Sequence, residues 1–437
     1  MTDPQNNRYG VDTLYITTPA LPETFPSVDI LTASPADMEA GWNLSGLSVG
    51  GAGEAGRFTS YPFIFDTNGD IRWYLDLSHF THIVDFIQRL ENGNFLAGHA
   101  RSLYELDVLG REVNRWDIPD YWYHHDVIEK PDGNFLIAVN KEGLATVEDH
   151  VIEIGRSTGT IVREWDLRQI LDVDRHDLLA NESDWFHMNA IWYEEQDDAL
   201  ILSGRNQGVV KVDGNNNLVW ILAPHQGWGA AGLDGNRPNT ADYLLTAVDA
   251  NGTPYGEAVQ QGTADAPNFA WVWGQHAPMR LDNGNLFIFD NGYNRNFSDA
   301  GHWSRGVEYE IDEDAMTIRQ IWEYGRSRGE AYYSQIISDV DELSETSNRL
   351  IMPGIINNEY AHVTEVTYPG KGVVFDARIN FANLYGSGQG WGEIDIVYRS
   401  ERLPLYLSQV GSAATSQPRV AQRSAPATSY SGPPRSL

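Results

Sequence analysis

The chain has 437 residues, of which 61 are acidic and 30 are basic, so its formal net charge is −31. This excess of negative charge disfavours nucleic acids and anionic membranes as partners, because both repel an acidic surface. The chain contains no cysteine, which excludes disulfides, thiol nucleophiles and thiolate metal sites.

Residues 1–40 are rich in proline and contain only short apolar runs, so we expect a strap or the remnant of a preceding domain. The opening sequence MTDPQNNRYG lacks the basic and apolar regions of a signal peptide, and the chain has no run of 18 apolar residues. As written, the sequence predicts a soluble, cytoplasmic protein.

Residues 41–410 are predicted to form an all-β domain, a six-bladed β-propeller of four-stranded blades. The clearest copy has strands at Asp126–Glu129, Phe135–Val139 and His150–Ile154, and a fourth strand that ends at Trp165. The turns between them contain Gly and Asn, which supply the positive backbone angles that hairpins need.

An aromatic residue closes each copy of the repeat. These residues are Trp73, Trp116, Trp165, Trp220, Trp322 and, in a weaker last copy, Phe375. Most neighbours in this series are about 43 to 55 residues apart, which is close to the period of a propeller blade. The longer interval between Trp220 and Trp322 holds one blade and an inserted segment, so the count predicts six blades.

The first copy shows only its outer strands, at Phe63–Phe65 and Ile71–Leu77. We expect Trp42–Val49 and Glu393–Tyr398, which are far apart in the sequence, to supply the missing strands. Such a pairing closes the ring and leaves no sheet edge bare.

Two further segments differ from the blades in composition. Residues 224–269 form the inserted loop, which is rich in Gly, Asn, Asp and Ala, and long loops of this kind are usually functional or disordered. Aromatic residues in or beside it are expected to wall an aromatic pocket: Trp228, Tyr243, Tyr255, Trp271 and Trp273. Residues 411–437 are of low complexity, and we expect a disordered tail.

Three histidines occupy the same position in three copies of the repeat. His125 and His276 are each followed by six residues, then Asp or Asn, then Gly-Asn and an apolar strand, and His187 follows the pattern more loosely. Each histidine is expected just before the innermost strand of its blade. Because stacked repeats bring equivalent positions together, we predict that the three imidazoles meet on one face, near the axis.

The second strand of each blade returns to that same face. In the fourth blade this return ends at Arg205, which we therefore expect beside His187. The corresponding return in the fifth blade is Asp290-Asn291, and in the second blade it carries His99 and Arg101. We take His99, Arg101 and His124 as candidate substrate-binding residues.

Such a site combines imidazoles with one permanent cation. A neutral imidazole is a competent nucleophile toward phosphorus or sulfur, and the planar donor fork of Arg205 suits a tetrahedral oxyanion. Two alternatives remain open: a metal-dependent, three-histidine lyase or hydrolase, and a propeller that binds a ligand without catalysis. The positive charge of Arg205 disfavours a metal cation in the cluster. The sequence contains no Gly-rich phosphate loop between a strand and a helix, which disfavours a nucleotide donor.

From about Asp29 to Tyr406 the chain resembles the aryl sulfotransferases that work without a nucleotide sulfate donor. The resemblance is carried by DILTASPADMEAGWNLSGLS, DTNGDIRWYLDL, HHDVIEKPDGN, WFHMNAIWY with SGR, and WGQHAPMRLDNGN. It implies a six-bladed propeller that moves a sulfuryl group from one phenol to another by a ping-pong mechanism, with no cofactor and no metal. The partners it implies are an aryl sulfate donor and a phenol acceptor.

The resemblance also implies roles for individual residues. His276, in QHAP, would be the nucleophile that becomes a sulfo-histidine, and His125, His187 and Arg205 would hold the sulfuryl oxygens. His125 is also a candidate for shuttling the phenolic proton. Periplasmic members of the family carry a signal peptide and an N-terminal β-sandwich, and some carry a cysteine pair. The chain departs from this pattern, so the resemblance leaves its compartment and oligomeric state open.

Overall fold

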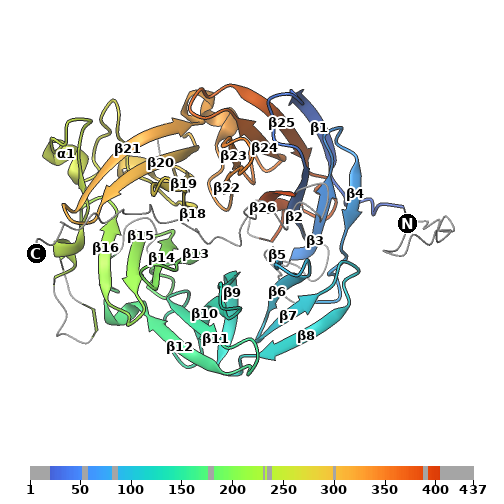
Figure 1. Cartoon of the computed structure of the whole chain (residues 1–437), viewed down its shortest axis with the longest axis horizontal. Helices are drawn as coiled ribbons and strands as arrows, with labels where there is room; N and C mark the ends of the chain where they lie inside the picture. Colours follow the sequence, from blue (N-terminus) through green and yellow to red (C-terminus); the bar gives the residue numbers. More distant parts are fainter. Residues whose placement is uncertain are drawn as a thin grey trace, which may run out of the picture.

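The protein is a ring of six antiparallel sheets, which confirms the predicted six-bladed β-propeller (Figure 1). The computed structural model describes residues 20–51, 58–80, 87–175, 182–229, 232–233, 239–298, 302–386 and 392–403. The predicted tail at 411–437 lies outside these residues, as do residues 1–19 and parts of the insertion. None of the helices in the described ranges is long and apolar enough to cross a membrane.

The strands of each blade follow one another from the central channel to the rim. In this order, blade 1 contains β26 (Ile396–Leu403), β2 (Trp42–Gly50), β3 (Phe58–Phe65) and β4 (Ile71–Tyr74). Blade 2 contains β5 (Ile87–Arg89), β6 (Phe95–His99), β7 (Ser102–Leu106) and β8 (Glu112–Asp117). Blade 3 contains β9 (Tyr121–Glu129), β10 (Phe135–Lys141), β11 (His150–Ile154) and β12 (Ile161–Asp166).

The second half of the ring is built in the same way, with one additional strand in each of its last two blades. Blade 4 contains β13 (Met188–Glu194), β14 (Ala199–Gly204), β15 (Gly208–Asp213) and β16 (Leu218–Leu222). Blade 5 contains β18 (His276–Arg280), β19 (Leu286–Asp290), β20 (Arg305–Asp312), β21 (Thr317–Tyr324) and β17 (Thr246–Ala247). Blade 6 contains β22 (Asp339–Glu342), β23 (Arg349–Met352), β24 (Tyr360–Val366), β25 (Val373–Asn380) and β1 (Ser27–Ala33). The short helices are η1 (Leu167–Gln169), η2 (Thr240–Tyr243), α1 (Glu257–Gln260), η3 (Arg295–Phe297) and η4 (Arg326–Tyr332).

The closing tryptophans lie in the outermost strands of the four-strand repeat and join each blade to the next. The indole Nε1 of Trp116 donates to the carbonyl of Arg156, at 2.8 Å, in the turn between the last two strands of the following blade. Trp165 makes the equivalent bond to Asp213, also at 2.8 Å. Trp73 and Trp322 make the same bond to the carbonyls of Val108 and Pro369. Trp220 donates instead to the side-chain carboxylate of Glu313 in the corresponding turn. A repeated contact between blades therefore explains the repeated aromatic.

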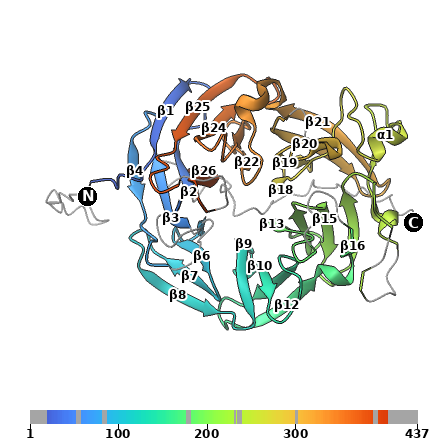
Figure 2. The same ribbon diagram turned by 180° about the vertical axis from the view of Figure 1, so that it is seen from behind.

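The ring closes by pairing two strands from distant parts of the sequence, as expected. In blade 1, β26 pairs antiparallel with β2, for example at Leu44 with Glu401, and Figure 2 shows the two strands side by side. The expected strand Glu393–Tyr398 was misplaced, because β26 spans Ile396–Leu403. Tyr398 consequently lies near the start of its strand, at the end where the inner strands of blades 4 and 5 carry their histidines.

Both segments outside the four-strand repeat add strands to the rim. β1 pairs with β25, and β17 pairs in parallel with β21. The described part of the insertion thus lies against the outside of the ring, where Figure 1 shows α1. The expectation of an aromatic pocket was wrong for Trp271 and Trp273, because both are buried in the hydrophobic core with Tyr255 packed against it.

Candidate active site

Backbone irregularities aim the three histidines into the site. His125 and His187 both have a positive φ, of 48° and 58°, and in blade 5 the residue after His276, Ala277, has a φ of 51°. The register of each inner strand shifts at or beside this point. Such bulges re-aim side chains. His125 was expected to precede its strand, but β9 begins at Tyr121, so His125 lies within β9 at the bulge.

The structure brings the predicted residues together at one end of the channel. The ring centroids of His125 and His187 are 5.2 Å apart, and the amide of Arg205 donates to the carbonyl of His187 at 3.0 Å. His276 is close enough for the charges of Arg205 and His187 to act on its pKa. His124 belongs to the same group, since its ring centroid lies 3.9 Å from that of His125.

A buried carboxylate, Glu148, joins three of these imidazoles, and sequence reasoning missed it. Its Oε1 lies 2.7 Å from Nε2 of His124, and its Oε2 lies 3.1 Å from Nδ1 of His187 and 3.7 Å from Nε2 of His125. Its backbone is held by Asn140, whose Oδ1 accepts from the Glu148 amide at 2.6 Å. Burial raises the pKa of Glu148, but the imidazoles of His124 and His187 lower it by more. The pKa of Glu148 therefore lies below its ordinary value.

Asn291 fixes the protonation of His276. Its Nδ2 donates to the carbonyls of Ser334 and Ile337 at 2.8 and 2.9 Å, which uses both amide hydrogens. Its Oδ1 is therefore the atom that faces Nδ1 of His276, at 2.8 Å, and Nδ1 must carry the hydrogen. Burial sets the pKa of His276 well below its ordinary value. At neutral pH, Nε2 of His276 consequently holds an unshared electron pair.

The remaining two imidazoles have different partners. His187 directs Nδ1 at the carboxylates of Asp184, at 2.7 Å, and Glu148. His125 places Nδ1 2.7 Å from the hydroxyl of Tyr398, which blade 1 delivers on β26. Burial sets the pKa of His125 well below its ordinary value. A neutral His125 therefore lies beside a His187 that faces two carboxylates.

Arg205, directly after β14, places a cation beside this group. Its side chain is buried and lies over the ring of Tyr293, with 4.9 Å between the guanidinium carbon and the ring centroid. Its Nε has no hydrogen-bond partner among the described residues. Burial lowers its pKa, but arginine stays charged in proteins. A guanidinium held by stacking, with an unused donor, can accept an oxyanion.

A second buried arginine ties the closing strand to the site. Arg399, beside Tyr398 on β26, donates to Asp126 at 2.6 Å and to the carbonyl of Asn189 at 3.1 Å. These partners belong to blades 3 and 4. Closure of the ring thus also fixes the strands that carry His125 and His187.

The two candidates from blade 2 have partners elsewhere. Arg101 donates to Glu142 at 2.6 Å and its guanidinium lies over Trp122, both at a partly exposed position. His99 packs against the rings of Phe80 and Tyr104, with centroids 4.8 and 6.2 Å away. Their participation in substrate binding stays a prediction.

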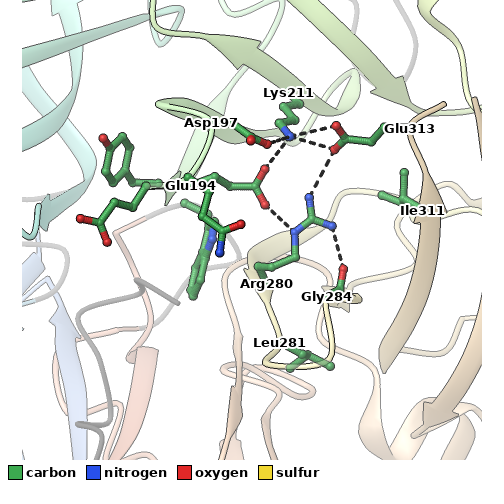
Figure 3. A pocket seen from close by; sticks show the side chains of 12 residues that line it. Glu194, Asp197, Lys211, Arg280, Leu281, Gly284, Ile311 and Glu313 are labelled. Carbon is green, nitrogen blue, oxygen red and sulfur yellow. Dashed lines mark hydrogen bonds and ion pairs between the residues drawn. The ribbon is translucent and has the colours of Figure 1, made fainter. Parts of the chain in front are cut away.

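A cavity of about 240 Å³ lies at the opposite face of the ring (Figure 3). It lies between the far hairpins of blades 4 and 5, and most of its charged residues pair with one another. Lys211 contacts Glu194 and Glu313, and Arg280 contacts Glu194 at 2.5 Å. These charged groups thus already neutralise one another, and the cavity lies at the face of the ring opposite the histidines.

A family model and two known proteins that resemble the chain point to the same family. A family model described as arylsulfotransferase (ASST) matches residues 6–386. The chain is 32% identical to the arylsulfate sulfotransferase AssT of Escherichia coli O6:H1 (strain CFT073), over 71% of this chain and 60% of that protein. It is 30% identical to AssT of Lelliottia amnigena, over 76% of this chain and 65% of that protein. The chain thus spans less than two thirds of the length of these relatives.

Among solved structures, a protein of unknown function from Bacteroides caccae aligns with a TM-score of 0.46 at 11% identity, over 83% of this chain and 98% of that one. This likeness is too distant to support an argument about function.

Proposed function

The chain belongs to the arylsulfotransferase family, and on that premise we propose that it transfers a sulfuryl group from an aryl sulfate ester to a phenol by way of a sulfo-histidine. The observation that carries this proposal is the pair formed by His276 and Asn291. Their 2.8 Å contact leaves Nε2 of His276 unprotonated, and burial keeps the imidazole neutral by lowering its pKa. A neutral imidazole of fixed orientation is the nucleophile that a covalent mechanism requires.

In the first half of the reaction, Nε2 of His276 attacks the sulfur of the donor. The new N–S bond forms as the bond from sulfur to the phenolic oxygen breaks, and the phenolate leaves with the bonding electrons. Charge on the three remaining sulfuryl oxygens needs donors that are already in place. The buried guanidinium of Arg205 supports this role, because its Nε has no hydrogen-bond partner among the described residues.

The contacts favour His187 over His125 as the proton carrier. Nδ1 of His187 faces two carboxylates, which hold the ring in one orientation and leave its Nε2 to exchange a proton with the substrate. His187 then protonates the departing phenolate in the first half. In the second half it takes the proton from the acceptor phenol, whose oxygen attacks the sulfur and releases His276. The proton given in one half is recovered in the other, so the cycle closes without a cofactor.

Donor alone tests this proposal. With a chromogenic aryl sulfate and no acceptor, we expect one burst of phenol per active site and the mass of one sulfuryl group on the peptide carrying GQHAPMR. His276→Ala should lose both the burst and the label. His225→Ala is the matched control, because His225 bonds to the backbone carbonyl of Leu245 in the insertion and should retain both. A burst that survives in His276→Ala, or a label on His125, would show that the nucleophile is misassigned.

A further inference from the structure

The geometry around Glu148 points to a binding site for a zinc ion, and we propose that Zn²⁺ bound there by His124, His125 and Glu148 inhibits the enzyme. The inhibitory consequence rests on the proposed function, whereas the binding of zinc does not. Zinc is bound by imidazole nitrogens and carboxylate oxygens, and two histidines with one glutamate form an established ligand set.

The three ligand groups are already close to the spacing that zinc needs. A tetrahedral ion with bonds of about 2.0–2.1 Å places its ligand atoms roughly 3.3 Å apart. Nε2 of His124 lies 2.7 Å from Oε1 of Glu148, and Nε2 of His125 lies 3.7 Å from Oε2. One ligand atom from each of the three residues lies within 4.8 Å of the others, so the side chains must close in by up to about 1.5 Å to coordinate the ion.

The fold holds Glu148 through its backbone and leaves the group partly exposed. Glu148 has a positive φ of 59° and bonds through its backbone to Asn140 and Met188. The side chains of His124 and Glu148 remain 21% and 11% exposed. Nε2 of His125 and Oε2 of Glu148 are themselves buried, so an ion would approach the site from the side of His124.

Zinc binding would compete with the arrangement that the reaction uses. Nε2 of His124 lies 2.7 Å from Oε1 of Glu148, and a metal ion would displace any proton held between these two atoms. The ion would also take Oε2 of Glu148 away from His187, which we propose as the proton carrier. It would further place positive charge and bulk beside His125, so the transferase should lose activity as the site fills.

A second group of possible ligands shares Glu148 and provides the control. Asp184 and His187 also lie within ligand distance of its carboxylate. They already contact each other at 2.7 Å. We commit to the first group because it supplies two imidazoles and one carboxylate, which is the composition that zinc prefers. Arg205 disfavours a cation among the histidines alone, but the negative charge of Glu148, on which Arg205 also acts, offsets that charge at this group.

Calorimetric titration of the full chain with ZnCl₂ tests the site directly. We expect one ion per chain, with at least about tenfold weaker binding in Glu148→Gln and in His124→Gln, because each substitution removes a ligand. Asp184→Asn and His276→Ala should bind zinc as the wild type does. Circular dichroism verifies that each variant is folded, and if one of the two ligand variants fails to fold, the other decides.

Three outcomes would overturn the assignment: no binding by the wild type, undiminished binding by the folded ligand variants, or loss of binding in Asp184→Asn. Turnover should fall as zinc binds and return with EDTA, and zinc-stimulated turnover would refute inhibition. His276→Ala should be inactive yet still bind zinc. The zinc titration therefore still tests the binding site if the proposed transferase activity is wrong.

Discussion

The contact between Asn291 and His276 makes the sharpest prediction, which concerns Asn291→Ala. In the native site Oδ1 of Asn291 accepts from Nδ1 of His276 at 2.8 Å, and both of its amide hydrogens bond to backbone carbonyls. Without this acceptor, no hydrogen bond to Asn291 favours the tautomer of the buried imidazole that carries its hydrogen on Nδ1. A fraction of the molecules then carries it on Nε2, where no electron pair is left for attack on sulfur.

The size of the effect follows from the environment of the bond. A buried polar group that loses its partner costs about 1–3 kcal/mol. Each 1.36 kcal/mol changes a rate about tenfold, so we expect the burst of phenol to slow by about 5- to 150-fold. The amplitude of the burst, which counts folded and competent sites, should change much less. Stopped-flow absorbance with a chromogenic aryl sulfate measures both quantities.

Asn283→Ala provides a matched control in the same blade. Asn283 lies at the far end of blade 5, where its amide donates to Glu308 at 3.0 Å. Losing that bond should lower the stability of the fold, which thermal unfolding measures, while the burst rate of the folded protein stays at the wild-type value. If Asn291→Ala slowed the burst no more than Asn283→Ala does, the argument from imidazole protonation would fail.

The other predictions concern charge, metal and acid. Arg205→Ala should still form the sulfo-histidine label, but about 10²–10³-fold more slowly in rapid-quench mass spectrometry, because one donor to the developing oxyanion is lost; an unchanged rate would contradict this role. Saturating EDTA should leave turnover unchanged or raise it, and loss of turnover that zinc restores would instead support the metal-dependent alternative. Burial raises the pKa of Glu105, but hydrogen bonds from Asn114, Asn94 and Asn92 outweigh it and lower the pKa to about 2. This carboxylate therefore stabilises the fold above the ordinary glutamate pKa, and its contribution disappears as the pH falls toward 2. Glu105→Gln should be less stable than the wild type at pH 7 in urea titrations, and the difference should shrink below about pH 4.5; the exposed Glu112→Gln is the control, and a difference independent of pH would rule out this linkage.

The blades could be predicted from the sequence because one contact repeats. Trp116 and Trp165 each bond to the next blade in the same way, so the same residue type recurs at one position in each copy. The additional strands β1 and β17 could not be predicted by this means. They attach to the rim of single blades and repeat nowhere else in the described chain.

Repetition also decides which site residues could be predicted from the sequence and which could not. His125, His187 and His276 share a position in the repeat, and Asn291 ends the return strand of its blade, so strand polarity was enough to group them. Glu148 lies in an irregular connection between β10 and β11 and has a left-handed backbone. Its place depends on Asn140 and on the amide of Met188 in the next blade, contacts that no periodic pattern encodes.

The closing strand has a consequence for the synthesis of the protein. Ser45 of β2 bonds to Ser400 of β26, 355 residues later in the chain. Ribosomes add about 5–20 residues per second, so roughly 20 to 70 s of translation separate the two partners. Until then blade 1 is incomplete, and His125 and Asp126 lack Tyr398 and Arg399. We therefore expect a nascent chain to be inactive even after the three blades that carry the histidines have folded. Activity should appear only when β26 pairs with β2.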